Sequence, residues 1–122
     1  MRKTNKQRGA EGEALARAYL EEKGYVWECS NFRVRTGEID LVMRDGNWLV
    51  FIEVKTRTST RYGHGSEAIT PAKQRTIRQT ALAYIKQKQG ASAASPLRFD
   101  VVVLTYSHSS GEPEIWHLPH AF

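Results

Sequence analysis

GEIDLVMRDGNWLVFIEVKT, residues 37–56, is the stretch that decides the fold. Two runs rich in β-branched and apolar residues, 37–44 and 47–56, flank Asp45-Gly46, a dipeptide typical of a two-residue hairpin turn. The second run is apolar on both faces from Trp48 to Ile52. A strand of this kind lies centrally in a sheet that is covered on both sides, so the stretch predicts a layered α/β structure.

Helix and strand patterns surround this hairpin. Gly24 stands where a C-terminal helix cap belongs, and Thr70-Pro71 supplies a cap and a first helical residue. The expected elements are a helix over 9–23, a strand over 25–33, the two strands of the hairpin, a helix starting at 70–71, and strands over 98–106 and 114–118. This order, α-β-β-β-α-β-β, predicts a central mixed β-sheet flanked by helices.

Length and composition predict one domain over residues 1–122, with a flexible basic N-terminus (1–8) and flexible loops at 57–66 and 90–96. No apolar run approaches the roughly 20 residues that span a bilayer, and the charged N-terminus is followed by no apolar segment. The single cysteine, Cys29, excludes an internal disulfide and a cysteine-based zinc site. We therefore expect a cytoplasmic protein without membrane contact.

The positive charge is clustered. Lys and Arg outnumber Asp and Glu by 18 to 13, and the pI is about 9.6. Two segments, 1–10 and 73–88, each contain several Lys and Arg residues and no acid. Such segments fit a polyanion such as nucleic acid, because each neutralised phosphate releases counterions. A solvated basic face that keeps the protein soluble is the alternative.

A possible acidic site begins with Glu53 and Lys55, whose side chains share one face of a strand because they are two residues apart. Alone, they indicate an ordinary ion pair. If Asp45 and Gly46 are the turn residues, Arg44 pairs with Asn47 and Asp40 lies opposite Phe51. Asp40 is then a diagonal neighbour of Glu53, roughly 7–8 Å away at the backbone. A shift of one residue would instead place Asp40 on the other face.

Two carboxylates on one face can share a divalent cation, whereas without one they repel each other and one tends to hold a proton. Hard oxygen ligands favour Mg²⁺, with Mn²⁺ as a related choice. Asp40 and Glu53 would hold the ion, which would activate a water molecule against a phosphodiester. Lys55 would position that water or stabilise charge on phosphorus. The pattern predicts metal-assisted phosphodiester hydrolysis.

Gly37-Glu-Ile-Asp40 followed by Glu53-Val-Lys55 resembles the D…E-x-K core of the restriction-endonuclease-like, or PD-(D/E)xK, superfamily. The chain also resembles the small bacterial YraN-like proteins, which are similar to archaeal Holliday junction resolvases. The further matching pieces are Gly9-x-x-Gly-Glu13-x-x-Ala16-x-x-Tyr-Leu20, Asn31-x-Arg33, Leu41, Val50-Phe-Ile, Thr56-Arg57, Lys73 and Arg98-Phe-Asp-Val101. Ile39 stands where the superfamily usually has proline. The resemblance implies an endonuclease-like fold and a DNA substrate that is branched or structured.

The resemblance also implies that Glu13 supports metal-bound water. Helical spacing permits this role for Glu13 or Glu11, and both acids also suit the N-terminal helix dipole. In the assumed register Glu38 faces Glu53, so it is either a further ligand or an edge charge held by Arg33 or Arg35. Arg57 and Arg61 are expected to approach phosphates, whereas Lys73 and Gln74 are either further phosphate contacts or ordinary exposed residues.

Other polar and aromatic residues are expected outside the site. Asp100, which interrupts an apolar strand, is interpreted as a structural hydrogen-bonding residue. His117 and His120 are expected in a solvent-exposed tail, and His64 lies in a Gly-rich loop. The three tryptophans, Trp27, Trp48 and Trp116, are expected in the core.

The favoured function is a Mg²⁺-dependent endonuclease acting on DNA. A non-catalytic nucleic-acid-binding module on the same fold is the main alternative, because a fold does not determine an activity. An adaptor that binds an acidic protein is a third. Cleavage of both strands of a junction would favour a homodimer.

Overall fold

In the computed structural model, residues 5–58, 69–88, 94–106 and 111–122 are described. The elements are α1 (Asn5–Glu22), β1 (Val26–Val34), β2 (Gly37–Asp45), β3 (Trp48–Arg57), α2 (Pro71–Gln87), β4 (Leu97–Thr105) and β5 (Glu114–Leu118). This order confirms the predicted α/β architecture. Helix α1 begins at Asn5, so residues 5–8, which were expected to be flexible, are helical. No helix in the described ranges is long and apolar enough to cross a membrane.

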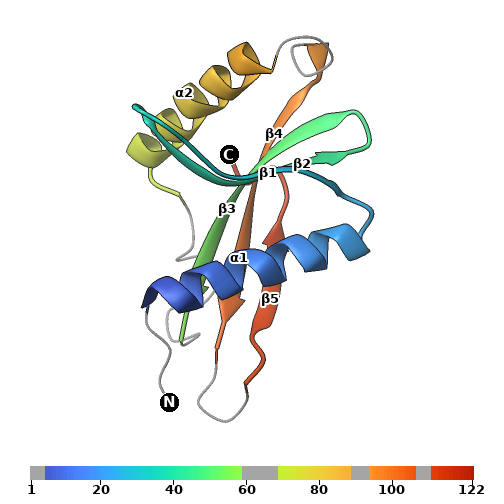
Figure 1. The fold of residues 1–122 in the computed structure, drawn as a ribbon, viewed down its shortest axis with the longest axis vertical. Helices are drawn as coiled ribbons and strands as arrows, with labels where there is room; N and C mark the ends of the chain where they lie inside the picture. Colours follow the sequence, from blue (N-terminus) through green and yellow to red (C-terminus); the bar gives the residue numbers. More distant parts are fainter. Residues whose placement is uncertain (1–4, 59–68, 89–93, 107–110) are drawn as a thin grey trace.

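The five strands form one mixed sheet in the order β1-β2-β3-β4-β5. Strands β3 and β4 are parallel, and the other neighbouring pairs are antiparallel. Strand β3 therefore lies at the centre, as its apolar run from Leu49 to Ile52 predicts. Figure 1 shows α1 and α2 on opposite sides of the sheet.

Each face of the sheet has its own apolar core. On the α2 side, Ile77, Ala81 and Tyr84 of the helix pack against Phe51 and Val103. On the α1 side, the core comprises Ala16, Leu20, Tyr25, Leu41, Met43, Val50, Ile52, Val102, Leu104 and Tyr106. The side chains of β3 alternate between the two cores, so a polar residue near its end is held firmly on one face.

The hairpin register differs from the prediction by two residues. Asp45 pairs with Trp48, so the turn consists of Gly46 and Asn47. Gly46 takes the positive φ of 60° that this turn needs. Asp45 stays in the strand because its carboxylate accepts a 2.8 Å hydrogen bond from Arg98. From Leu41 to Asp45, a shift of two residues leaves each side chain on its predicted face.

Two glycines let the helices approach the sheet closely. A Cβ at Gly12 of α1 would lie 2.8 Å from Thr56 Oγ1 of β3, and a Cβ at Gly37 would lie 2.7 Å from Thr76 Cγ2 of α2. Helix α1 therefore crosses the end of β3 at short range. This crossing places the residue after Gly12, which is Glu13, beside the carboxyl end of the central strand.

Candidate functional site

Asp40 and Glu53 come together at the carboxyl end of β3. The ladder between β2 and β3 pairs Leu41 with Ile52, and Asp40 and Glu53 are the next residues on the two strands. The expected diagonal placement opposite Phe51 is thus wrong, and the two carboxyl groups are closer than expected, within hydrogen-bonding reach of each other. One oxygen of Asp40 also accepts a 2.8 Å hydrogen bond from the backbone N–H of Val54, which fixes the side chain against β3.

The Asp40 carboxyl holds a proton at neutral pH. Burial disfavours its charged form, and the neighbouring Glu53 carboxyl adds a hydrogen bond and like-charge repulsion, so its pKa rises to about 8. The hydrogen bond from Val54 acts in the opposite direction but does not compensate. The sequence-based reasoning that two carboxylates without a cation would keep one proton describes this pair.

Glu53 has an incompletely satisfied carboxylate. Its side chain is 14% exposed, and its Oε2 atom is buried without a hydrogen-bond partner. Lys73 Nζ, on the first turn of α2, lies 3.4 Å from this oxygen. That distance makes an ion pair, but the geometry is not that of a hydrogen bond. A buried carboxylate oxygen in this state is costly unless another group approaches it.

Glu13 is the first-helix acid that faces this pair. The negative charges of Glu38 and Glu53 act on it, it hydrogen-bonds with Asn31, and burial raises its pKa above the ordinary value. Glu11, which helical spacing could not exclude, instead accepts a 3.3 Å hydrogen bond from Tyr106 O–H. The structure thus separates two acids that the sequence left equivalent.

Asn31 explains how α1 and the acid pair meet. It is one of two described non-glycine residues with positive φ, at 53°, and lies in β1 between the partners of Ile39 and Leu41. Those two neighbours of Asp40 pack into opposite cores, Ile39 on the α2 side and Leu41 on the α1 side. Asn31 also hydrogen-bonds with Glu13, so it links α1 to the part of the sheet that contains Asp40. Positive φ at asparagine is a common local adaptation, but the sequence did not reveal it.

The remaining predicted residues lie at varying distances from the pair. Lys55 is half-buried and follows Glu53 on the same face. Glu38 does not face Glu53 as expected; Arg33 holds it at 3.0 Å. Gln74 Nε2 donates to the Ile69 carbonyl at 2.8 Å. Arg57, another predicted phosphate contact, donates from Nε to Thr105 Oγ1 at 3.3 Å. Arg61 and His64 lie outside the described residues.

The donor set suits a hard divalent cation. Asp40 and Glu53 offer carboxylate oxygens at one point, and the orphaned Oε2 of Glu53 is an acceptor that a cation would satisfy. In the described part of the chain, no group of three or more His, Cys, Asp or Glu side chains could hold a metal ion. Two carboxylates with water molecules completing the shell correspond to Mg²⁺, which keeps several waters in proteins. Glu13 would then act on such a water and not on the ion itself.

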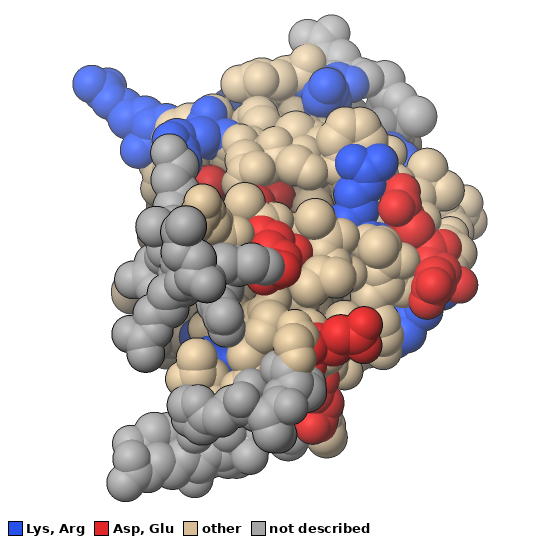
Figure 2. Space-filling view, turned by 60° about the horizontal axis from the view of Figure 1, so that its bottom comes forward, with Lys and Arg blue, Asp and Glu red and all other residues tan. Residues whose placement is uncertain are grey.

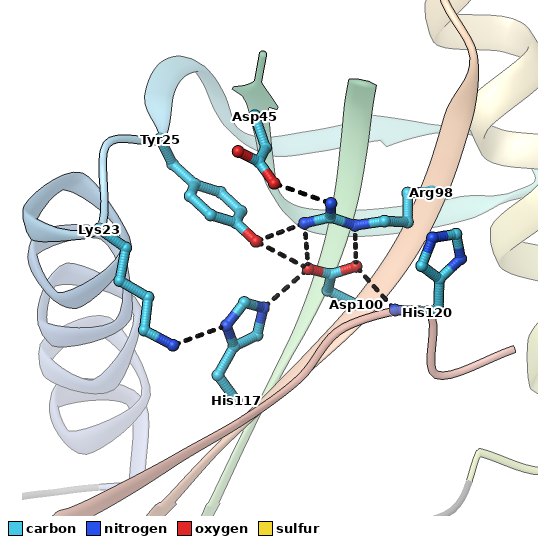
Figure 3. Close-up of polar contacts among 7 residues, drawn as sticks. All are labelled: Lys23, Tyr25, Asp45, Arg98, Asp100, His117 and His120. Carbon is cyan, nitrogen blue, oxygen red and sulfur yellow. Dashed lines mark hydrogen bonds and ion pairs between the residues drawn. The ribbon is translucent and has the colours of Figure 1, made fainter. Parts of the chain in front are cut away.

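A second polar cluster lies on the α1 side of the sheet, around Asp100 (Figure 3). Asp100 is fully buried and accepts two hydrogen bonds of 2.9 Å from Arg98 and one of 2.7 Å from His117 Nε2. Burial alone would raise the pKa of Asp100, but the hydrogen bonds from His117 and Arg98 lower it overall. Arg98 also donates to Tyr25 and Asp45. The cluster ties the start of β1, the hairpin turn, β4 and β5 together, which confirms the structural interpretation of Asp100.

Several expectations outside the site are wrong. His117 is not in an exposed tail: its side chain is 4% exposed, and Lys23 Nζ approaches its Nδ1 at 3.1 Å. Because an ammonium group only donates, Nδ1 accepts and the ring proton is on Nε2, facing Asp100. His120 is exposed, as expected, although its backbone N–H donates to Asp100 at 3.2 Å. Trp27 and Trp116 are 37% and 40% exposed because β1 and β5 are the sheet edges.

Comparisons with known proteins place this arrangement in a family. The model of the uncharacterised protein family UPF0102 matches residues 12–104. A UPF0102 protein of Geobacter metallireducens is 47% identical over 118 residues, covering 97% of this chain and 93% of the relative. A UPF0102 protein of Rhodococcus opacus is 44% identical over 114 residues, covering 93% of this chain and 94% of the relative. A UPF0102 protein of Bifidobacterium longum is 42% identical over 120 residues, covering 98% of this chain and 95% of the relative. The matched range includes Glu13, Asp40, Glu53 and Lys55.

Proposed function

The chain belongs to the uncharacterised family UPF0102, and on that premise we propose that it is a nucleic-acid-binding protein that hydrolyses phosphodiester bonds in DNA with the help of Mg²⁺ or Mn²⁺. The observation that carries the proposal is the pair of Asp40 and Glu53, in which one buried carboxylate oxygen has no hydrogen bond. A purely structural pair of acids would have acquired donors for this oxygen.

Asp40 and Glu53 would hold the cation with their facing oxygens, and Asp40 would release its proton in doing so. When bound, a divalent cation of this kind polarises a phosphodiester and lowers the pKa of a water molecule. Lys55, two residues after Glu53, would orient the attacking water or stabilise the charge that develops on phosphorus. Glu13, whose own pKa is raised, would accept a hydrogen bond or a proton from that water.

Lys73 would change partners during binding. It now neutralises Glu53 at 3.4 Å from the first turn of α2. With a cation bound by Glu53, the lysine ammonium would be free to contact a phosphate oxygen of the substrate. This exchange explains why a cation is present at a helix N-terminus, where the helix dipole disfavours it.

The resemblance to junction resolvases supports branched or structured DNA as the substrate, and cleavage of both strands of a branch would require two copies of the chain. A non-catalytic nucleic-acid-binding module remains the second candidate. It is favoured by the absence, among the described residues, of a third carboxylate or histidine close enough to complete a metal group.

The test is a cleavage assay on branched, duplex and single-stranded DNA with Mg²⁺ or Mn²⁺ and with EDTA. We expect the wild type to cut at least the branched substrate with either metal, and Asp40→Asn, Glu53→Gln and Lys55→Ala to reduce the rate by at least about 100-fold. Glu21→Gln is the matched control, because it removes an exposed carboxylate that is paired with Arg17 on α1.

The wild type and the variants must bind DNA equally well, because only then does a difference in cleavage rate report on the hydrolysis step. Cleavage that persists in Asp40→Asn and Glu53→Gln would contradict the proposal. Tight DNA binding by the wild type without cleavage under any of these conditions would establish the non-catalytic module instead.

A further inference from the structure

We propose that the outer surface of α2 binds the phosphate backbone of a double-stranded DNA arm, which extends from the acid pair along the helix. This proposal rests on the proposed function, because it concerns the substrate of the same site. The surface, called here the α2 basic surface, consists of Arg75, Arg78, Lys86 and Lys88.

All four side chains of the α2 basic surface are exposed, and the helix contains no acid. Within the described residues, neither Arg75 nor Lys86 forms an ion pair. Arg78 stacks over the rings of Phe99 and Phe122 at 4.8 and 5.4 Å, which holds its guanidinium group in a fixed position. These unneutralised cations create a positive field on this side of the sheet.

Among the described charged side chains of α1, acids outnumber bases. The described charged side chains of α1 are Arg17 and four glutamates, Glu11, Glu13, Glu21 and Glu22. A groove of about 460 Å³ beside this helix is lined by Glu11, Glu22 and Glu112 together with apolar residues. Figure 2 shows a face on which several groups of acidic side chains lie, with Lys and Arg side chains beside them. A polyanion is therefore attracted to the α2 basic surface, because α2 contains no acid that would offset these cations.

The α2 basic surface leads away from the acid pair. Lys73, on the first turn of α2, is 3.4 Å from Glu53, so the N-terminal end of the helix adjoins the site. From Lys73 to Lys88 the axis extends about 22 Å at the helical rise. That length equals about six base pairs of duplex. A DNA arm could thus contact the helix along its length while one phosphodiester lies near Asp40.

The chemistry of the surface favours a duplex over an unpaired strand. Proteins that bind single strands combine cations with aromatic side chains on which bases stack. The one aromatic residue of α2, Tyr84, is fully buried and cannot serve as such a platform. In the described part of the chain Arg75 and Lys86 contact no aromatic ring, and cations of this kind contact phosphates and leave the base pairs intact.

The experiment compares two double variants, each of which removes two positive charges from a chain of net charge +5. Arg75→Gln/Lys86→Gln alters the α2 basic surface, and Arg17→Gln/Lys23→Gln alters the opposite side. Binding of a fluorescent duplex is measured by anisotropy in EDTA over a range of salt concentrations, so that no cleavage occurs. Thermal melting of both variants verifies that they are folded, which matters for Lys23 because it contacts His117.

We expect the α2 variant to reduce the slope of log K against log salt by about 2, because each lost phosphate contact removes about 0.9. Its affinity at about 0.15 M salt should fall about 30-fold, if binding is equal at about 1 M. The α1-side variant should keep the wild-type slope. Arg75→Lys/Lys86→Arg should retain the wild-type slope as well, because it conserves the charge.

Equal losses in the two double variants, or a wild type that prefers single strands, would overturn the α2 proposal. Neither outcome decides the catalytic proposal, which is tested by the Asp40 and Glu53 variants. Conversely, the wild type could bind duplex, show the reduced salt slope only in the α2 variant, and never cleave DNA. That result would refute the proposed nuclease activity and establish the α2 basic surface as a binding surface.

Discussion

The pKa of Asp40 predicts how the stability of the metal-free protein depends on pH. The folded protein holds a proton on Asp40 up to about pH 8, whereas the unfolded chain releases it near 3.8. Between these values the native state binds more protons than the unfolded state, so the free energy of unfolding falls as the pH rises. One proton corresponds to about 1.4 kcal/mol per pH unit. The proton held by Asp40 therefore lowers the free energy of unfolding by about 3 kcal/mol as the pH rises from about 5 to 7.

Asp40→Asn removes this titration while keeping the side-chain shape and the acceptor for Val54 N–H. Urea unfolding, followed by circular dichroism in EDTA at several pH values from about 5 to 7, gives the two stability curves. Between about pH 5 and pH 7, we expect the free energy of unfolding of Asp40→Asn to rise by about 3 kcal/mol relative to that of the wild type. Glu21→Gln, on the exposed surface of α1, should follow the wild type. Parallel curves for wild type and Asp40→Asn would refute a protonated, buried Asp40.

Three further outcomes follow from the structure. Mg²⁺ at about 100 times its Kd should stabilise the wild type near pH 8 by about 2.7 kcal/mol in thermal melts, and Glu53→Gln should abolish this gain; equal stabilisation of both would remove Glu53 from the metal site. Asp100→Ala removes the fully buried one of the two carboxylates that pair with Arg98 and should cost about 3–5 kcal/mol in urea unfolding; a loss below about 1 kcal/mol would show that the cluster around Asp100 relaxes. Gly12→Ala should destabilise by about 1–3 kcal/mol because of its close contact with β3, while Gly9→Ala, with open space around it, should stabilise by up to about 1 kcal/mol; similar effects at both positions would contradict the close crossing.

The hairpin shows how far local patterns reach. The apolar run in β3 and the adjoining turn residues predicted a central strand paired with β2, and this pairing is present. The exact register was missed by two residues, because Asp45 is kept in the strand by Arg98, a residue 53 positions away. From Leu41 to Asp45 the side chains nevertheless kept their predicted faces, since a strand repeats every two residues.

The choice between Glu11 and Glu13 shows a different limit. Both residues suit the first helix, and only the crossing of α1 over β3 at Gly12 decides that Glu13 lies among the site acids while Glu11 binds Tyr106. His117 was missed for the same reason. Its importance arises from Asp100, which is distant in sequence and reaches it across the pairing of β4 with β5.

The sequence by itself determined the order of elements, the buried character of β3, and the shared face of Glu53 and Lys55, because these depend on contacts between residues close along the chain. Only the tertiary structure decided which acids meet, which carboxyl keeps its proton and which histidine is buried. Those properties depend on burial and on charges brought together from distant segments, and neither has a periodic signature in the sequence.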